Sequence, residues 1–469
     1  MTVFRFKKRR PSLKQRSRAT IKPETSRLPE KDETRKRRVR IIGRCVVILF
    51  LLTVYHITSE AVYIHEQPVY FPSDNTLPSD PNQNIETREY EPLVDKKEVR
   101  DLLDSQLFVN LKTKDFYFVS EEQRLHVETT IDPLLQNFIM EKMDTTTSRH
   151  IGIVAMDPYS GRVLSMVGFD REDPNNNPCV DSIFPAASVF KIVTAAAAIE
   201  KCGFESDTKV TYSGRKHTLY KSQLKKKTRR RLKSITLRDS FAQSINPVFG
   251  KIGIHELGKT ALEEYADAFG FNQDIDFEIP LAPSVFSISD ETYHWAEVAS
   301  GFNRETTISP LHGALIASAI LNQGQMIEPV IIDEVRDEKG DAVYQGDMVP
   351  FNRAITPDAS DIMNELMQAT IKSGTCRKMF RGYRRDPVLS KLTIGGKSGT
   401  ISSKDRKSRY DWFVGFAEEK DGPEKIVTAI VVAHGKYIGI RSAKYARIVF
   451  KEYFSNYFSS QESELRSEN

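Results

Sequence analysis

The order of the predicted helices and strands indicates one α+β domain over about residues 125–460, preceded by one transmembrane helix. Three observations support this class. Apolar helical runs are interspersed with β-rich runs, the last strands form an antiparallel hairpin, and no internal repeat is visible. We therefore expect an antiparallel sheet flanked by helices.

The N-terminal part of the chain has a charge pattern of its own. Residues 1–40 contain 16 Lys or Arg and 4 Asp or Glu, whereas the remainder contains 52 basic and 59 acidic residues. The excess of positive charge belongs to a tail, residues 1–38, so the overall balance does not indicate nucleic-acid binding and we expect no nucleic-acid partner.

An apolar segment follows this tail. Residues 39–58 are predicted to be an uncleaved transmembrane signal anchor, although a spanning helix usually needs roughly 20 apolar residues and Arg44 must reach the headgroups. A cleaved signal peptide or a buried core helix fits less well beside so long a basic region. The positive-inside rule then predicts a single-pass protein of the inner (cytoplasmic) membrane, with its catalytic domain periplasmic or otherwise extracytoplasmic.

The stretch from the anchor to the domain is predicted to be a linker, residues 59–124, because Pro68–Tyr90 is rich in Pro, Asn, Asp and Ser. Residues 461–469 are predicted to be a C-terminal tail. The four cysteines show no spacing typical of a metal site, and we interpret them as small buried hydrophobes.

The elements of the domain follow from local patterns. Residues 127–132 are a predicted strand leading into a helix, and Gly203 after the apolar helix suits a left-handed cap. Thr236 with Asp239 resembles a capping box that opens a helix carrying Ser244. The other predicted helices cover residues 133–143, 188–201, 259–269, 310–322, 359–372 and 442–458. The other predicted strands cover residues 151–156, 162–167, 392–394, 411–416 and 426–433.

The apolar helix begins with a serine and a lysine three residues apart. Ser188 is close to the positive end of the helix dipole, and Lys191 lies on the same face. A lysine among apolar residues has a lowered pKa and can accept the serine proton. Taken alone, the same two residues are equally well explained by a serine that caps the helix and a lysine that extends to solvent.

Two further polar groups lie on predicted elements. Ser244 and Asn246 are expected inside a helix before Pro247, where such side chains can pass a proton or hold an amide, or form a solvent-facing patch. Residues 395–400 end a strand with Gly-Gly-Lys-Ser-Gly-Thr. A phosphate loop is disfavoured here because the Gly-x-x-x-x-Gly-Lys spacing and a following helix are missing.

Taken in order, the motifs Ser188-x-x-Lys191, Ser244-x-Asn246 and Lys397-Ser398-Gly399 resemble those of the penicillin-binding proteins and serine β-lactamases. The resemblance extends over about residues 125–460. Further segments similar to the family are 127–136, 156–162, 307–314, 328–329, 373–375 and 411–416.

The resemblance implies the penicillin-binding transpeptidase fold, with an all-helical subdomain beside the sheet, and a serine D,D-transpeptidase activity that crosslinks peptidoglycan. Lys191 would deprotonate Ser188, which attacks the D-Ala–D-Ala amide of a stem peptide. The N–H groups of Ser188 and Thr400 would form the oxyanion hole. Ser244, supported by Lys397, would pass the proton to the leaving D-alanine.

The resemblance also implies substrate contacts and partners. Asn246 would hold the peptide, and Ser398, Gly399 and Thr400 would bind its terminal end, with the hydroxyls on the carboxylate. Stem peptides and β-lactams are the expected ligands, and a membrane glycosyltransferase is a candidate partner. No cofactor or metal is expected.

Some features depart from the family pattern. Ala186-Ala187 replaces the familiar Pro-Gly before the nucleophile, and the sequence shows neither a glycosyltransferase domain nor the Glu-x-x-Leu-Asn signature of a β-lactamase. A D,D-carboxypeptidase, a β-lactamase and a non-catalytic penicillin sensor or scaffold remain alternatives. Residues 215–233 carry eleven basic side chains, His217 included. We interpret this segment either as a solvated hairpin or as a surface that binds an anionic wall polymer or an acidic partner.

Overall fold

The computed structural model describes residues 95–103, 105–120, 123–226 and 232–467, all within one unit of the chain, Glu89–Asn469. The predicted basic tail and signal anchor lie outside these residues, so both stay predictions. Of the helices in the described ranges, none combines the length and apolar character needed to cross a membrane.

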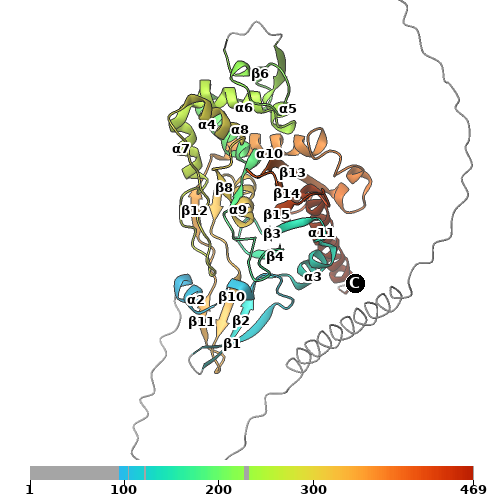
Figure 1. Ribbon diagram of the computed structural model, residues 1–469. Coiled ribbons are helices and arrows are strands. Elements are labelled where there is room, and N and C mark those ends of the chain that lie inside the picture. Colours follow the sequence, from blue (N-terminus) through green and yellow to red (C-terminus); the bar gives the residue numbers. More distant parts are fainter. Residues whose placement is uncertain (1–94, 104, 121–122, 227–231, 468–469) are drawn as a thin grey trace, which may run out of the picture. The chain divides into compact units, whose positions relative to one another are not determined.

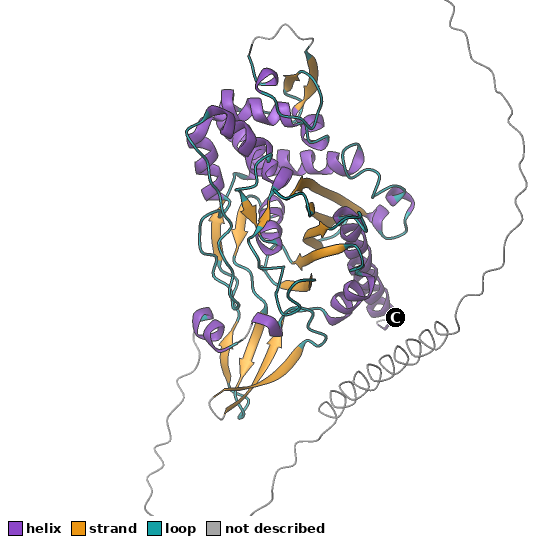
Figure 2. Ribbon diagram, in the orientation of Figure 1, coloured by secondary structure: helices purple, strands orange, loops and turns teal. Residues whose placement is uncertain are grey.

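A five-stranded antiparallel sheet lies at the centre of the described unit (Figures 1 and 2). This confirms the predicted antiparallel sheet, and its last strands are longer than predicted because their pairing extends the hydrogen-bonded ladder into polar sequence. In spatial order the strands are β13 (Leu392–Ser402), β14 (Arg409–Glu419), β15 (Lys425–His434), β3 (Ser148–Met156) and β4 (Val163–Asp170).

Both faces of this sheet are buried. On β15, Val427, Ala429 and Val431 belong to one hydrophobic core, whereas the alternate residues Ile426 and Ile430 belong to the other. Because side chains alternate between the two faces of a strand, a strand buried on both faces has a continuous apolar sequence, as residues 426–433 do. The covering helices are α9 (Pro310–Leu321) on the first face and α3 (Pro133–Lys142) with α11 (Ser442–Ser467) on the second.

A mainly helical lobe lies beyond β13, with α10 (Pro357–Lys372) packed against that strand (Figure 1). The lobe also contains an antiparallel pair, so the prediction of an all-helical subdomain is wrong in this respect. Gly203 caps its helix in the left-handed conformation and Thr236 accepts the Asp239 N–H, both as predicted. The lobe consists of α4 (Lys191–Cys202), β6 (Lys209–Tyr212), β7 (Lys233–Thr236), α5 (Leu237–Ala242), α6 (Asn246–Ile252), α7 (Gly258–Ala268) and α8 (Thr292–Ser300).

A second, four-stranded sheet includes part of the predicted linker. It has the order β1-β2-β10-β11: β1 pairs with the neighbouring β2, and β2 pairs on its other side with β10, about 200 residues later in the chain. Ordered structure thus begins before the predicted boundary at residue 125, because β1, within the predicted linker, pairs with β2. The elements are α2 (Lys96–Leu102), β1 (Asp115–Ser120), β2 (Gln123–Thr129), β10 (Ile332–Arg336) and β11 (Ala342–Gln345).

Short pairs complete the connections between these layers. They are β5 (Phe184–Pro185) with β8 (Thr307–Ile308), and β9 (Gln325–Ile327) with β12 (Pro350–Arg353). The β5–β8 pair fixes the chain just before Ser188.

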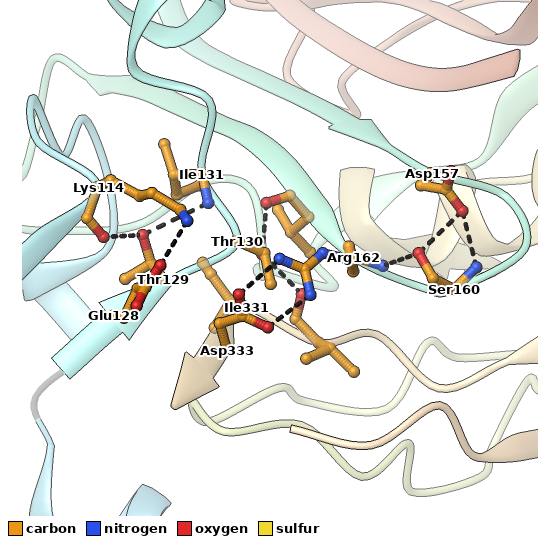
Figure 3. A network of polar contacts seen from close by, with 12 residues as sticks. Lys114, Glu128, Thr129, Thr130, Ile131, Asp157, Ser160, Arg162, Ile331 and Asp333 are labelled. Atoms are coloured by element: carbon orange, nitrogen blue, oxygen red, sulfur yellow. Dashed lines mark hydrogen bonds and ion pairs between the residues drawn. The ribbon is translucent and has the colours of Figure 1, made fainter. Parts of the chain in front are cut away.

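A polar network joins the two larger sheets (Figure 3). Arg162, which follows the β3–β4 turn, forms a two-pronged ion pair with Asp333 of β10 at 2.5 and 2.8 Å. The Thr130 hydroxyl lies 2.7 Å from the carbonyl oxygen of Val163 and 3.0 Å from that of Val330. Because these partners are far apart in sequence, the contacts set the orientation of one sheet against the other.

We expect the Arg162–Asp333 pair to stabilise the fold measurably. A double-mutant cycle with Arg162→Met and Asp333→Leu should give a coupling free energy of about 1 kcal/mol in urea unfolding, because the pair is bidentate and about two thirds buried. The more exposed pair Lys201–Glu264 serves as the control, with about 0.3 kcal/mol expected. Equal coupling in the two cycles would contradict this role.

Candidate active site

A cleft of about 780 Å³ opens between the helical lobe and β13. Its lining includes residues from all three sequence motifs, which are far apart along the chain. The predicted residues on its wall are Ser188, Ser244, Asn246, Ser398, Gly399 and Thr400. Lys191 and Lys397 lie beneath this wall with no exposed surface.

Ser188 lies in a tight turn, Ala187–Phe190, that precedes α4. Ala187 has a φ of +50°, a strained conformation for a residue with a side chain. Its carbonyl oxygen is pressed against Gly301, where a Cβ atom would lie only 1.8 Å away. On the other side, a Cβ on Gly399 would lie 3.3 Å from the Ser188 nitrogen. The backbone at Ser188 is thus held between two glycines.

Lys191 makes three polar contacts and no ion pair among the described residues. Its Nζ lies 2.8 Å from the Ser188 Oγ and 2.8 Å from the Asn246 Oδ1, and it donates to the Ser300 carbonyl. Burial, and secondarily the charge of Lys397, lower the pKa of Lys191 well below its ordinary value. Burial therefore favours the uncharged amine, which is in contact with a hydroxyl.

Ser244 and Asn246 do not lie inside one helix, and that prediction is wrong. Ser244 falls between α5 and α6 with a φ of +52°, and Asn246 is the first residue of α6. The break arises because Pro247 has no N–H to continue the α5 ladder but fits the first turn of a new helix. The interruption turns both side chains into the cleft.

Lys397 is bound to the second motif. Its Nζ donates to the Ser244 Oγ at 3.1 Å and to the Ser398 carbonyl at 2.7 Å. Burial lowers the pKa of Lys397 to about 7, so it changes charge near neutrality. Ser398 lies on the opposite face of β13, where its Oγ is 2.6 Å from the Thr375 Oγ1. Two lysines of low pKa thus reach the same cleft from opposite sides.

Thr400 is linked to a buried ion pair. Its hydroxyl donates to Asp411 at 3.2 Å, and Asp411 accepts two hydrogen bonds from Arg441 at 2.6 and 2.7 Å. Burial alone would raise the pKa of Asp411, but hydrogen bonds and the charge of Arg441 hold it below its usual range. Arg441 is thereby fixed next to Thr400 on the cleft wall.

Part of the predicted basic segment borders the cleft. His217 lines it, with Nδ1 3.2 Å from the Ser244 carbonyl oxygen, and the Lys216 carbonyl accepts the Asn246 N–H at 2.8 Å. Residues 227–231 of this segment lie outside the described residues, so its interpretation as a binding surface for an anionic polymer or an acidic partner stays a prediction.

The structure brings together all eight predicted site residues. Sequence reasoning missed several that complete the site: Ser300, Gly301, Thr375, Asp411 and Arg441. Thr375 and Asp411 lie in segments that resemble the family, so a signal existed, whereas Ser300 contributes a carbonyl that any residue type could supply. Within the described ranges, no three His, Cys, Asp or Glu gather as a metal site.

Comparison with known proteins agrees with this geometry. Residues 151–454 match the penicillin binding protein transpeptidase domain, so the chain belongs to that family. It is 23% identical over 370 residues to peptidoglycan D,D-transpeptidase PbpA of Mycolicibacterium smegmatis, covering 71% of this chain and 72% of that protein. It is 26% identical to stage V sporulation protein D of Bacillus subtilis, covering 66% of this chain and 49% of that protein.

Solved structures show the same fold. The D,D-transpeptidase domain of a peptidoglycan glycosyltransferase from Eggerthella lenta superposes with a TM-score of 0.57 at 22% identity, over 70% of this chain and 82% of that one. PBPA from Mycobacterium tuberculosis superposes with a TM-score of 0.56 at 21% identity, over 70% of this chain and 79% of that one. A further structure of penicillin-binding protein A from that species is an acyl-enzyme complex with penicillin G.

We expect the contact between Gly301 and Ala187 to be essential for the nucleophile turn. Gly301→Ala should slow acylation of Ser188 about 100-fold, because a methyl group would displace the Ala187 carbonyl and misplace the serine. The measurement is the rate of labelling by a fluorescent penicillin.

Gly203→Ala is a matched control for this variant. Gly203 also caps a helix in the left-handed conformation, with φ of +62° against +61° for Gly301, but has open space around it. We expect Gly203→Ala to lose about 1 kcal/mol of stability and to keep its acylation rate. Similar rates in the two variants would contradict the importance of the contact.

Proposed function

We propose that this chain is a membrane-anchored serine D,D-transpeptidase that crosslinks peptidoglycan stem peptides through a Ser188 acyl-enzyme. The observation that carries the proposal is the contact, at 2.8 Å, of the Ser188 hydroxyl with the fully buried Lys191 amine, whose pKa burial lowers well below its ordinary value. A neutral amine has two N–H groups and one lone pair. The N–H groups go to Asn246 and Ser300, which leaves the lone pair for the serine proton.

Acylation follows from this arrangement. Lys191 takes the proton as the Ser188 Oγ attacks the carbonyl carbon of the penultimate D-alanine. The backbone N–H groups of Ser188 and Thr400 stabilise the negative charge on the carbonyl oxygen, which the close approach of Gly399 to the Ser188 nitrogen favours. The C–N bond then breaks, and Ser244 passes a proton to the leaving D-alanine while Lys397 supports the hydroxyl.

The substrate peptide is held along β13. This strand is an edge of the five-stranded sheet, so an extended peptide can pair with its outer side. Asn246 holds the peptide on the other side of the cleft. The Ser398 and Thr400 hydroxyls, with the Arg441 charge behind them, bind the terminal carboxylate.

The second half of the reaction is the attack of an amine from another stem peptide on the acyl-enzyme. Water as the acceptor would make the protein a carboxypeptidase with the same residues. Anchoring by residues 39–58 at the inner membrane, an extracytoplasmic catalytic domain and a membrane glycosyltransferase partner belong to the same proposal, and their support is the sequence pattern of the N-terminal part.

Labelling with a fluorescent penicillin tests the proposal. The full chain should form a stable covalent adduct that is lost in Ser188→Ala and kept in Ser459→Ala, an exposed serine on α11. Incubation with two synthetic stem peptides should then yield a crosslinked dimer. Rapid hydrolysis of the penicillin would instead indicate a β-lactamase, and a stable adduct with no peptide turnover a sensor or scaffold. Absence of an adduct would rule out the proposed function.

The pH dependence of acylation should be bell-shaped. The rate should fall in acid as Lys191 becomes protonated, and should fall again above about pH 7 as Lys397 loses its proton. Lys397→Met should slow acylation and remove the alkaline limb, whereas Lys391→Met, an exposed lysine before the same strand, should keep both limbs. An alkaline limb that survives in Lys397→Met would assign the proton to another group.

A further inference from the structure

One rim of the cleft is strongly cationic. In addition to Arg441, the cleft lining contains four basic side chains that the proposed acylation does not use. They are Arg304, Lys378, Arg406 and Arg409. The one acidic side chain in the same lining is Asp411, which is buried and already bound to Arg441. The cleft therefore presents net positive charge to whatever enters it.

Among the described residues, no carboxylate forms an ion pair with these four side chains. The Asp405 carboxylate accepts hydrogen bonds from the Lys407 backbone N–H and the Ser403 hydroxyl, both in its own hairpin. Glu305 forms an ion pair with Lys404 at 3.3 Å. Lys378, Arg406 and Arg409 form no ion pair among the described residues, and all three are exposed. Arg304 also lacks an ion-pair partner there and donates from Nε to the Ser402 carbonyl at 2.7 Å. We call these four side chains the cationic rim.

A single exposed arginine is usually only a solvated side chain. The cationic rim differs because its members come from separate segments and line one cleft, with Arg304 and Arg409 both at Ser402. Arg304 follows α8, Lys378 follows α10, and Arg406 and Arg409 lie on the β13–β14 hairpin. Convergence of like charges is unfavourable for the free protein, so it indicates an anionic ligand.

The position of the rim relative to the proposed chemistry defines this ligand further. Arg409 pairs across the sheet with Ser402, two residues beyond Thr400 on β13. The Arg304 side chain reaches the same Ser402. Two residues of strand span roughly 7 Å, so a ligand whose terminal carboxylate contacts Ser398 and Thr400 meets the rim with a second group about that far away.

We propose that the cationic rim binds a second carboxylate of the peptide, so that this protein prefers stem peptides whose acidic groups are free over those in which they are amidated. This inference rests on the proposed function, which identifies the ligand as a stem peptide. It adds that the preferred peptide carries a free internal carboxylate. The guanidinium groups of Arg304, Arg406 and Arg409 can bind a carboxylate in a bidentate manner, which a neutral carboxamide cannot reproduce.

Equilibrium binding to the unreactive Ser188→Ala chain tests the proposal without depending on catalysis. The probes are two synthetic pentapeptides that end in D-Ala–D-Ala and differ only in one internal acidic residue, as the free carboxylate or as the carboxamide. We expect the acidic peptide to bind about tenfold more tightly at low salt, and the preference to shrink at high salt because exposed charges are screened.

Two variants made in the same Ser188→Ala chain locate the effect. Replacement of Arg406 and Arg409 by Gln should reduce the preference to about twofold or less. Arg124→Gln, an exposed arginine of β2 in the four-stranded sheet, should leave it at its original value. The melting temperature of each variant verifies that it is folded.

Equal affinity of the two peptides, or a preference that the Arg406 and Arg409 replacements leave intact, would overturn the proposal. Failure of the proposed function is a different result, because it appears as the absence of a penicillin adduct on the chain that retains Ser188. Binding of an inorganic polyphosphate with no discrimination between the peptides would point to a wall polymer as the ligand and would also overturn it.

Discussion

The structure of the site depends on the burial of Lys191 without a carboxylate partner. Burying a charged ammonium group among apolar helices costs far more than burying an amine, so burial lowers the pKa of this side chain and favours its neutral form. The neutral nitrogen still requires hydrogen-bond partners, and the available ones lie on separate segments, at Ser188, Asn246 and Ser300. The helical lobe has to fold as a unit for this nitrogen to be satisfied.

The same logic extends to the opposite side of the cleft. Lys397 is also fully buried without an ion pair, and its proximity lowers the pKa of Lys191 further. A proton on Lys397 therefore disfavours a proton on Lys191. Such a pair suits a reaction in which a proton leaves one hydroxyl and arrives at a leaving group on the other side.

The sheet and the lobe make different contributions to this arrangement. The five-stranded sheet is rigid, since apolar cores cover both of its faces, and it leaves β13 as an edge next to the nucleophile. The lobe supplies the turn of Ser188 and the break between α5 and α6. Strain collects at this junction, where Ala187 and Ser244 both have positive φ angles. The surrounding packing, including the contact of Gly301 with Ala187, holds these angles in place.

Local sequence determined the elements whose hydrophobic pattern and caps are self-contained, such as the apolar helix of Lys191 with its Gly203 cap and the strand at 426–433. It also predicted the chemistry, because the residue types at Ser188, Lys191 and Lys397 are specific in their order. Only the tertiary structure decided that the β1–β2 hairpin belongs to a four-stranded sheet, since β2 pairs with β10, about 200 residues away. It likewise placed Ser300, Gly301 and the cationic rim. Their roles come from a carbonyl, a missing methyl group and a convergence of charges, and none of these is a property of a short stretch of sequence.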